Sequence, residues 1–146
     1  MLVQLIRLLR IPQYTKNGFV FLPLFFGGEL FCFPSFVKCC YAFAAFCLAA
    51  SVVYILNDIQ DADDDRRHPV KRNRPIASGT VSLQQAIGTA MILLVLSIIA
   101  AWQTESSACL FLIGGYWGLN LFYIYWGKRK AILDVACIAA GFVLRA

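Results

Sequence analysis

Residues 57–79 join an acidic stretch directly to a basic one, in a chain that is otherwise strongly apolar. Of the eight acidic residues in the sequence, five lie within eight positions, and they are Asp58, Asp61, Asp63, Asp64 and Asp65. The next nine positions hold five basic residues, which are Arg66, Arg67, Lys71, Arg72 and Arg74. Carboxylates followed by cations indicate a divalent metal that holds a phosphorylated substrate.

Three of the aspartates share one side of a helix, if the apolar run before them continues as a helix. At about 100° per residue, Asp58, Asp61 and Asp65 fall within a sector of roughly 60°, while Asp63 points elsewhere. Asn57 lies beside this sector and could add an amide oxygen. The alternative, an acidic helix end beside a solvated loop, leaves the shared side unexplained. Because neighbouring carboxylates repel and hard oxygen ligands favour Mg²⁺, we predict that Asp58, Asp61 and Asp65 hold Mg²⁺ and act in catalysis.

The rest of the sequence has the composition of an integral membrane protein. Hydrophobic residues make up 60% of the chain and charged residues 14%, and the mean hydropathy is +0.71. Four apolar runs are long enough to cross about 30 Å of hydrocarbon as helices, and they cover residues 18–36, 39–56, 81–102 and 106–126. A fifth run begins at Ala131 and continues to Ala146. We therefore expect an all-α, polytopic transmembrane helix bundle with about four complete membrane helices and the start of a fifth, truncated from a longer polypeptide.

The basic residues between the apolar runs predict the orientation. If the first helix enters from the cytoplasm, eleven basic residues, including those at 128–130, fall on the cytoplasmic side and Lys38 alone on the other. This strong positive-inside signal places the aspartate loop, residues 57–80, in the cytoplasm. The net charge of +5 suits anionic lipid headgroups. The sequence lacks the alternation of aromatic and basic residues seen in nucleic-acid modules, so we expect no nucleic-acid partner.

Two local patterns predict where helices end and begin. A short amphipathic helix over residues 1–10, ended by Pro12, has an apolar face formed by Leu2, Leu5, Ile6 and Leu9. Ser82, three residues before Gln85, forms the pattern of a capping box, which predicts a helix from this point. Residues 66–80 are then expected to form a loop held close to the membrane.

The aspartate loop resembles the first aspartate-rich motif of the UbiA superfamily of intramembrane prenyltransferases. The resemblance covers Asn57-Asp58-x-x-Asp61-x-x-x-Asp65 and continues through Arg66, His68-Pro69, Lys71 and Arg74-Pro75-Ile76-Ala77-Ser78-Gly79. The decaprenyl-phosphate phosphoribosyltransferase branch has similar sequences at Arg10-Ile-Pro-Gln-Tyr-Thr-Lys16-Asn17, at Leu133-Asp134-Val135 and at Gly141-Phe142-Val143-Leu144-Arg145-Ala146. The resemblance covers essentially the whole chain and about the first half of a family member. We therefore expect residues 1–146 to be the N-terminal part of a single UbiA-like transmembrane domain.

What the resemblance implies is a transfer at an anomeric carbon. Members of this branch transfer 5-phosphoribose from phosphoribosyl pyrophosphate to a polyprenyl (decaprenyl) phosphate, and they make a lipid-linked sugar for cell-envelope biosynthesis. In the superfamily the aspartates coordinate Mg²⁺ and a substrate diphosphate. The resemblance also implies a multi-pass protein of the bacterial inner (plasma) membrane. Side chains suited to bind substrate phosphates are Lys16, Asn57, Arg66, Lys71 and Arg74.

Two alternative functions stay open. A prenyltransferase of the same superfamily would bind a prenyl diphosphate and alkylate an aromatic or quinone-precursor acceptor, although the Lys16 segment argues against it. A non-enzymatic membrane scaffold or transporter fragment would bind anionic lipids through its basic loops, but it leaves the aspartates on one helix side unexplained. For Arg67, Arg72 and residues 128–130 we favour a role in topology or headgroup binding. Arg145 lies in or near a membrane segment, where a charge is costly and usually functional.

Overall fold

The computed structural model describes residues 2–127 and 131–145, so the basic residues at 128–130 lie outside the described residues. Within those ranges every regular element is a helix. The chain begins with α1 (Leu2–Leu9), the 3-10 helix η1 (Ile11–Phe21) and the short α2 (Leu22–Phe26). It continues with α3 (Phe33–Gln60), α4 (Ala62–Arg67), the 3-10 turn η2 (Lys71–Asn73), α5 (Leu83–Trp102), α6 (Ser107–Tyr125) and α7 (Ala131–Val143).

Three of these helices, α3, α5 and α6, are long and apolar enough to cross a membrane. They correspond to three of the four predicted runs, and α5 and α6 begin and end within two residues of the predicted bounds. Helix α7 begins at Ala131, where the fifth run was expected. The prediction of an all-α, polytopic bundle is therefore confirmed, and the protein is an integral membrane protein.

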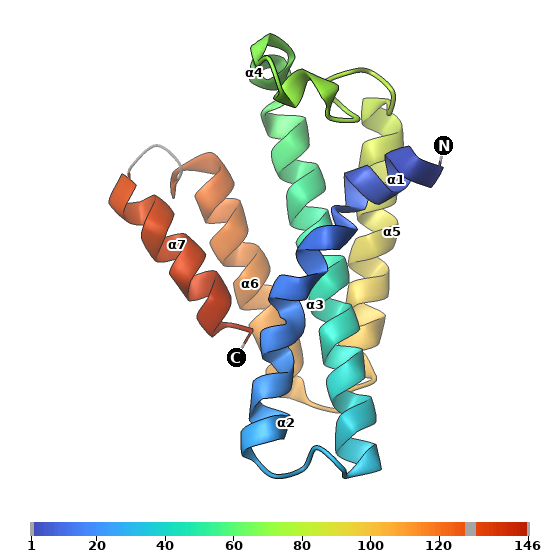
Figure 1. The fold of residues 1–146 in the computed structure, drawn as a ribbon, viewed down its shortest axis with the longest axis vertical. Helices are drawn as coiled ribbons and strands as arrows, with labels where there is room; N and C mark the ends of the chain where they lie inside the picture. Colours follow the sequence, from blue (N-terminus) through green and yellow to red (C-terminus); the bar gives the residue numbers. More distant parts are fainter. Residues whose placement is uncertain (1, 128–130, 146) are drawn as a thin grey trace.

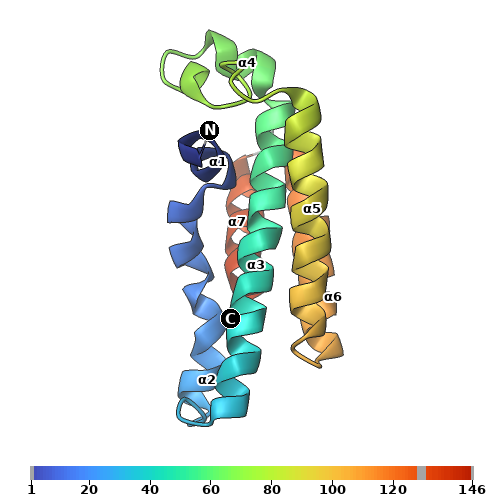
Figure 2. The same ribbon diagram turned by 90° about the vertical axis from the view of Figure 1, so that its right-hand side faces the viewer.

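The number of membrane helices differs from the prediction because the run at residues 18–36 is not one helix. It contains the end of η1, all of α2, a turn and the start of α3. Gly28 in the turn has a φ of +72°, a left-handed conformation that favours glycine. Pro34 follows in the first turn of α3, where a missing amide hydrogen has no cost. As Figures 1 and 2 show, η1 and α2 instead run alongside α3 in the opposite direction.

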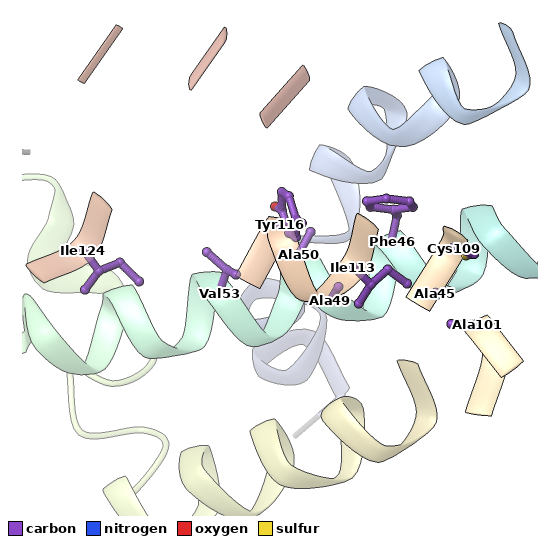
Figure 3. Close-up of a cluster of buried hydrophobic side chains, with 10 residues drawn as sticks. All are labelled: Ala45, Phe46, Ala49, Ala50, Val53, Ala101, Cys109, Ile113, Tyr116 and Ile124. Atoms are coloured by element: carbon purple, nitrogen blue, oxygen red, sulfur yellow. The ribbon is translucent and has the colours of Figure 1, made fainter. Parts of the chain in front are cut away.

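Helix α3 is the centre of the bundle and packs against α5, α6, η1 and α1. Figure 3 shows the larger core cluster, in which α3 supplies Ala45, Phe46, Ala49, Ala50 and Val53. Ala45 and Ala49 are fully buried, and such small side chains let helix backbones approach closely in a membrane. The Ser97 hydroxyl of α5 donates a hydrogen bond to the Ala45 carbonyl at 2.9 Å, which ties α5 to α3 inside this core.

The predicted N-terminal helix is present, and it packs on the bundle through Leu9 of the predicted face and through Leu8, which lies outside that face. Leu8 is 1% exposed and lies in a second core cluster with residues of α3, α5 and the loop before α5. Ile6, which belongs to the predicted apolar face, is 39% exposed. Periodicity shows that α1 has two faces, but the direction of its docking depends on how the chain turns at Arg10, whose φ is +52°.

The two ends of the bundle differ in charge. Helices α1 and α4 and the loop to α5 lie at one end (Figure 1). These segments and the adjoining Arg10 carry seven of the thirteen basic residues of the chain. At the other end Lys38 at the start of α3 pairs with Glu105 between α5 and α6, with 2.8 Å between Nζ and Oε2. This hydrogen bond and the charge of Lys38 lower the pKa of the Glu105 carboxyl. The side of the membrane on which each end lies stays a prediction.

Candidate functional site

The aspartates lie where α3 passes into α4. Helix α3 ends at Gln60, so the continuous helix assumed from the sequence is interrupted at Asp61. The backbone nevertheless keeps helical spacing, because the Asp61 amide donates to the Asn57 carbonyl at 2.9 Å and the Asp65 amide to the Asp61 carbonyl at 2.8 Å. As a result, Asp58 and Asp65 are both buried, at 2% and 3% exposure, whereas Asp63 is exposed.

Arg74 joins the two buried carboxylates. Its Nη1 donates to Asp65 Oδ2 at 2.7 Å and to Asp58 Oδ1 at 3.2 Å. Asp58 Oδ1 also accepts from Arg10 Nη2 at 2.5 Å, and the Arg10 guanidinium lies 4.9 Å from the centroid of the Tyr54 ring. Because a buried carboxylate without a partner is strongly destabilising, this cluster of Arg10, Asp58, Asp65 and Arg74 must form as a unit. We call it the Asp–Arg cluster.

The loop that carries Arg74 is held by local hydrogen bonds and by its apolar residues. The Pro75 carbonyl accepts three hydrogen bonds, from Ser78 Oγ at 3.3 Å, Thr80 Oγ1 at 3.0 Å and the Val81 amide at 3.0 Å. Ile76 is 5% exposed and belongs to the core cluster that also contains Leu8. The predicted capping box at Ser82 and Gln85 is present and starts α5 immediately after the loop. These contacts bring Arg74 back over the end of α3.

The donor atoms of the cluster suit a hard divalent cation, but their present arrangement is that of an ion-pair cluster. Carboxylate oxygens are the ligands Mg²⁺ prefers, and Asp58 and Asp65 converge on a single cationic group, that of Arg74. Each uses one oxygen in these contacts. Among residues 2–127 and 131–145, no group of three or more acidic, histidine or cysteine side chains is spaced to hold a metal ion. The Mg²⁺ site at Asp58, Asp61 and Asp65 stays a prediction.

Two cavities adjoin the Asp–Arg cluster and share three cations, Arg10, Lys71 and Arg74. The first, which we call the loop cavity, has a volume of about 930 Å³ and lies between α1 and the loop before α5, with Asp58 in its lining. The second, the aspartate cavity, has a volume of about 390 Å³ and is lined also by Asn57, Asp61, Tyr54, Asn120 and Tyr123. Four residues predicted from the sequence, Asn57, Asp61, Lys71 and Arg74, thus meet in one cavity.

Lys16 lies in a third cavity, apart from the aspartates. This Lys16 cavity has a volume of about 220 Å³ and is lined also by Tyr116 and Arg145. It adjoins the aspartate cavity, because the two have three lining residues in common, Tyr54, Asn120 and Tyr123. Lys16 was expected beside the aspartates, but the structure places it in a separate, adjoining cavity, and its role in phosphate binding stays a prediction.

The other predicted residues have local partners. Arg66 pairs with Asp63 on the surface through Nη1, and its Nε donates to the Ala77 carbonyl at 3.4 Å. His68 Nδ1 accepts from the amides of Val70 and Lys71, at 3.2 and 3.3 Å, and so shapes the turn before η2. The described lining residues of the three cavities include neither Arg66 nor His68.

Sequence reasoning missed Arg10 as a site residue, together with the polar aromatic residues of the cavities. It counted Arg10 only as a charge for topology, although the residue opens a segment that resembles a known family. The signal that could have found it is electrostatic. Three neighbouring carboxylates need more positive charge than one arginine provides, and Arg10 directly follows α1, which lies at the same end of the bundle as α4 (Figure 2).

Comparison with known proteins identifies the family of the chain. The sequence matches the UbiA prenyltransferase family over residues 20–146, a range that includes three of the four residues of the Asp–Arg cluster. It is 38% identical over 145 residues to the decaprenyl-phosphate phosphoribosyltransferase of Corynebacterium glutamicum, a match that covers 97% of this chain and 44% of that protein. It is 33% identical over 145 residues to the protein of the same name from Mycobacterium tuberculosis, covering 97% and 48%.

A third relative carries a different name. The nodulation protein NoeC of Azorhizobium caulinodans is 32% identical over 140 residues, which cover 93% of this chain and 44% of that protein. The chain spans less than half the length of each of these three relatives. Since the family match extends over far more than half of the chain and contains the aspartates, this integral membrane protein belongs to the UbiA prenyltransferase family.

Proposed function

We propose that the protein serves in a transferase that moves 5-phosphoribose from phosphoribosyl pyrophosphate to a polyprenyl (decaprenyl) phosphate in a bacterial inner membrane. The observation that carries the proposal is the Asp–Arg cluster beside the aspartate cavity, because it combines ligands for a divalent cation with donors for phosphate. The names of the relatives from Corynebacterium glutamicum and Mycobacterium tuberculosis support this choice of substrates.

The cations of the site suit a donor with several phosphate groups. Arg10, Lys71 and Arg74 line both the loop cavity and the aspartate cavity, and Arg7 adds a fourth positive charge to the loop cavity. Arginine binds phosphate through two parallel hydrogen bonds, and a cluster of cations attracts a highly charged soluble donor. The loop cavity, at about 930 Å³, falls within the usual size of small-molecule sites.

The carboxylates would hold Mg²⁺ through Asp58, Asp61 and Asp65, and the bound ion would supply positive charge to the departing pyrophosphate. Arg10 and Arg74 have two further roles in the site. They orient the buried Asp58 carboxylate and place positive charge beside it. The Arg74 guanidinium, which now contacts two carboxylates, is within reach of the same cavity and can turn its remaining N–H groups toward phosphate oxygens.

A second candidate uses the same residues. The family is described as one of prenyltransferases, so a prenyl diphosphate could occupy the cationic site while an aromatic or quinone-precursor acceptor is alkylated. A prenyl diphosphate carries fewer phosphate charges and needs fewer cations to balance them. Its apolar chain would also gain nothing from the positive charge of the loop cavity. We therefore favour the phosphoribosyl donor.

An assay with labelled donors tests the proposal. Membranes that contain the protein are supplied with labelled phosphoribosyl pyrophosphate and a polyprenyl phosphate, and in parallel with a labelled prenyl diphosphate and an aromatic acid. We expect a phosphoribosyl lipid in the first mixture and none from membranes carrying Asp58→Asn, while Arg67→Gln, an exposed change on α4, serves as the matched control. A prenylated aromatic acid without phosphoribosyl lipid would favour the second candidate, and neither product would favour a non-enzymatic role.

A further inference from the structure

Arg145 is a buried cation without an acidic partner among the described side chains. It follows α7 and is 9% exposed. Its Nη2 donates to the Tyr116 hydroxyl at 2.7 Å, and its Cζ lies 4.9 Å from the Tyr116 ring centroid and 5.6 Å from that of Phe142. Its Nε is buried and has no hydrogen-bond partner among the residues that the structure describes. A charge in this environment is costly, so an anionic ligand is the simplest compensation.

A second cation faces the same space. Lys16 and Arg145 both line the Lys16 cavity, together with the polar side chains of Tyr116 and Asn120. The lining residues that the structure describes include no aspartate or glutamate. The small cavity thus offers two positive charges, a tyrosine hydroxyl and a free N–H group, which together match a compact, doubly charged oxyanion.

We propose that Lys16, Tyr116 and Arg145 bind a phosphomonoester dianion, at a site distinct from the Asp–Arg cluster. This inference rests on the proposed function, since both of its substrates carry such a group. One source is the 5-phosphate of the donor. The other is the phosphate of the lipid acceptor, and Arg145 also lines an apolar cavity of about 320 Å³ beside Val20, Phe46 and Leu112. Either source would lie next to the aspartate cavity, which shares lining residues with this one.

Binding measurements on the protein in lipid nanodiscs test the site without any transfer. The probes are ribose 5-phosphate and farnesyl phosphate, each titrated by calorimetry, with ribose and farnesol as uncharged controls. We expect Arg145→Gln to weaken binding of one phosphorylated probe by about tenfold or more, because a charge-assisted hydrogen bond in a buried site is lost. Lys16→Gln should weaken the same probe, and Arg67→Gln should leave both affinities unchanged.

The pattern of losses identifies the source of the phosphate. A loss confined to ribose 5-phosphate assigns the site to the donor, and a loss confined to farnesyl phosphate assigns it to the lipid. Unchanged affinities in Arg145→Gln and Lys16→Gln, or no binding of either probe to the unaltered protein, would overturn the proposal. If Arg145→Gln does not fold, the affinity of Lys16→Gln tests the proposal by itself. Lys16 is exposed, so its substitution should leave the fold intact. A protein that binds a probe through these residues but makes no phosphoribosyl lipid would refute the proposed function and leave this site standing.

Discussion

Asp58 is the residue on which the candidate site depends most. Its carboxylate is 2% exposed and shares one oxygen between Arg10 and Arg74. Removal of a single partner from a buried ion pair costs far more than the pair contributes, because the remaining charge is left desolvated. The charges of Arg10, Asp58, Asp65 and Arg74 therefore depend on one another, and substitution of one residue leaves the charge of its partners less well balanced.

This coupling predicts different effects at two aspartates of α4. Asp65→Ala should lower the free energy of unfolding by about 1–3 kcal/mol, because Arg74 loses a buried, charged hydrogen-bond acceptor. Asp63→Ala should lower it by less than about 1 kcal/mol, since its pair with Arg66 is exposed. Thermal unfolding in detergent compares the two variants. Equal losses would mean that the Asp65–Arg74 contact does not stabilise the fold.

Dependence of transfer on Mg²⁺ is the second prediction at this scale. Transfer by the protein should stop in EDTA and return with Mg²⁺, because three carboxylates near the substrate phosphates repel without an added cation. Asp61→Asn should likewise abolish transfer while membrane insertion is kept. Product formation at full rate in EDTA would show that Arg10 and Arg74 alone balance the charge of the site.

Among the elements, α3 determines the geometry of the bundle. Its alanines allow the close approach of neighbouring helices, and its last turn carries Asn57 and Asp58 to the site. A displacement of α3 would thus move the carboxylates relative to Arg10 and Arg74, which come from other segments. The core packing of α3 and the positions of the carboxylates at its C-terminal end are therefore linked.

Overpacking of this helix is the third prediction. Ala49→Leu should lower the free energy of unfolding by about 1–3 kcal/mol or prevent folding, because Ala49 is fully buried and the added carbons have no space. Ala139→Leu introduces the same side chain at an exposed position of α7 and should be close to neutral. Detergent unfolding of both variants provides the comparison. A stable Ala49→Leu protein would show that α3 can shift without cost.

For the molecule as a whole, the unequal distribution of charge predicts its orientation. With all six native cysteines replaced, a cysteine at position 71 should be labelled by a membrane-impermeant maleimide from the cytoplasmic side, and one at position 38 from the other. The reason is the excess of basic residues at the end of the bundle that carries the aspartate loop. Sealed right-side-out and inverted vesicles allow the measurement. Labelling of position 71 from the periplasmic side alone would reverse the orientation.

The arrangement of the three cavities is also a property of the whole molecule. Each is lined by residues far apart in the sequence, and neighbouring cavities share side chains such as Arg74 or Tyr54. A phosphorylated donor near the aspartates and a second phosphate near Arg145 would therefore lie in adjacent spaces. This proximity is what a transfer between two phosphorylated substrates requires.

Local patterns in the sequence were enough to predict α3, α5 and α6 as membrane helices, the capping box of α5 and the helical spacing from Asn57 to Asp65. These features depend on hydrophobicity, hydrogen bonds between near neighbours and helical spacing, all of which act over a few residues. Asn57, Asp61, Lys71 and Arg74, which the charge pattern and the family resemblance singled out, line one cavity, and their role in substrate binding stays a prediction. Composition wrongly predicted a single membrane helix at residues 18–36, because a glycine turn between two apolar segments hardly changes the mean hydropathy.

Long-range contacts had to come from the tertiary structure. The pairing of Arg10 with Asp58 spans 48 positions, and the hydrogen bond between Arg145 and Tyr116 spans 29. The partner of a buried charge depends on which segments pack together. In a membrane, small buried side chains such as Ala45 and Ala49 determine which helices can approach closely. The residue types indicated the chemistry of the site, but only the packed helices determine which cation meets which carboxylate and place Arg145 beside Lys16 in one cavity.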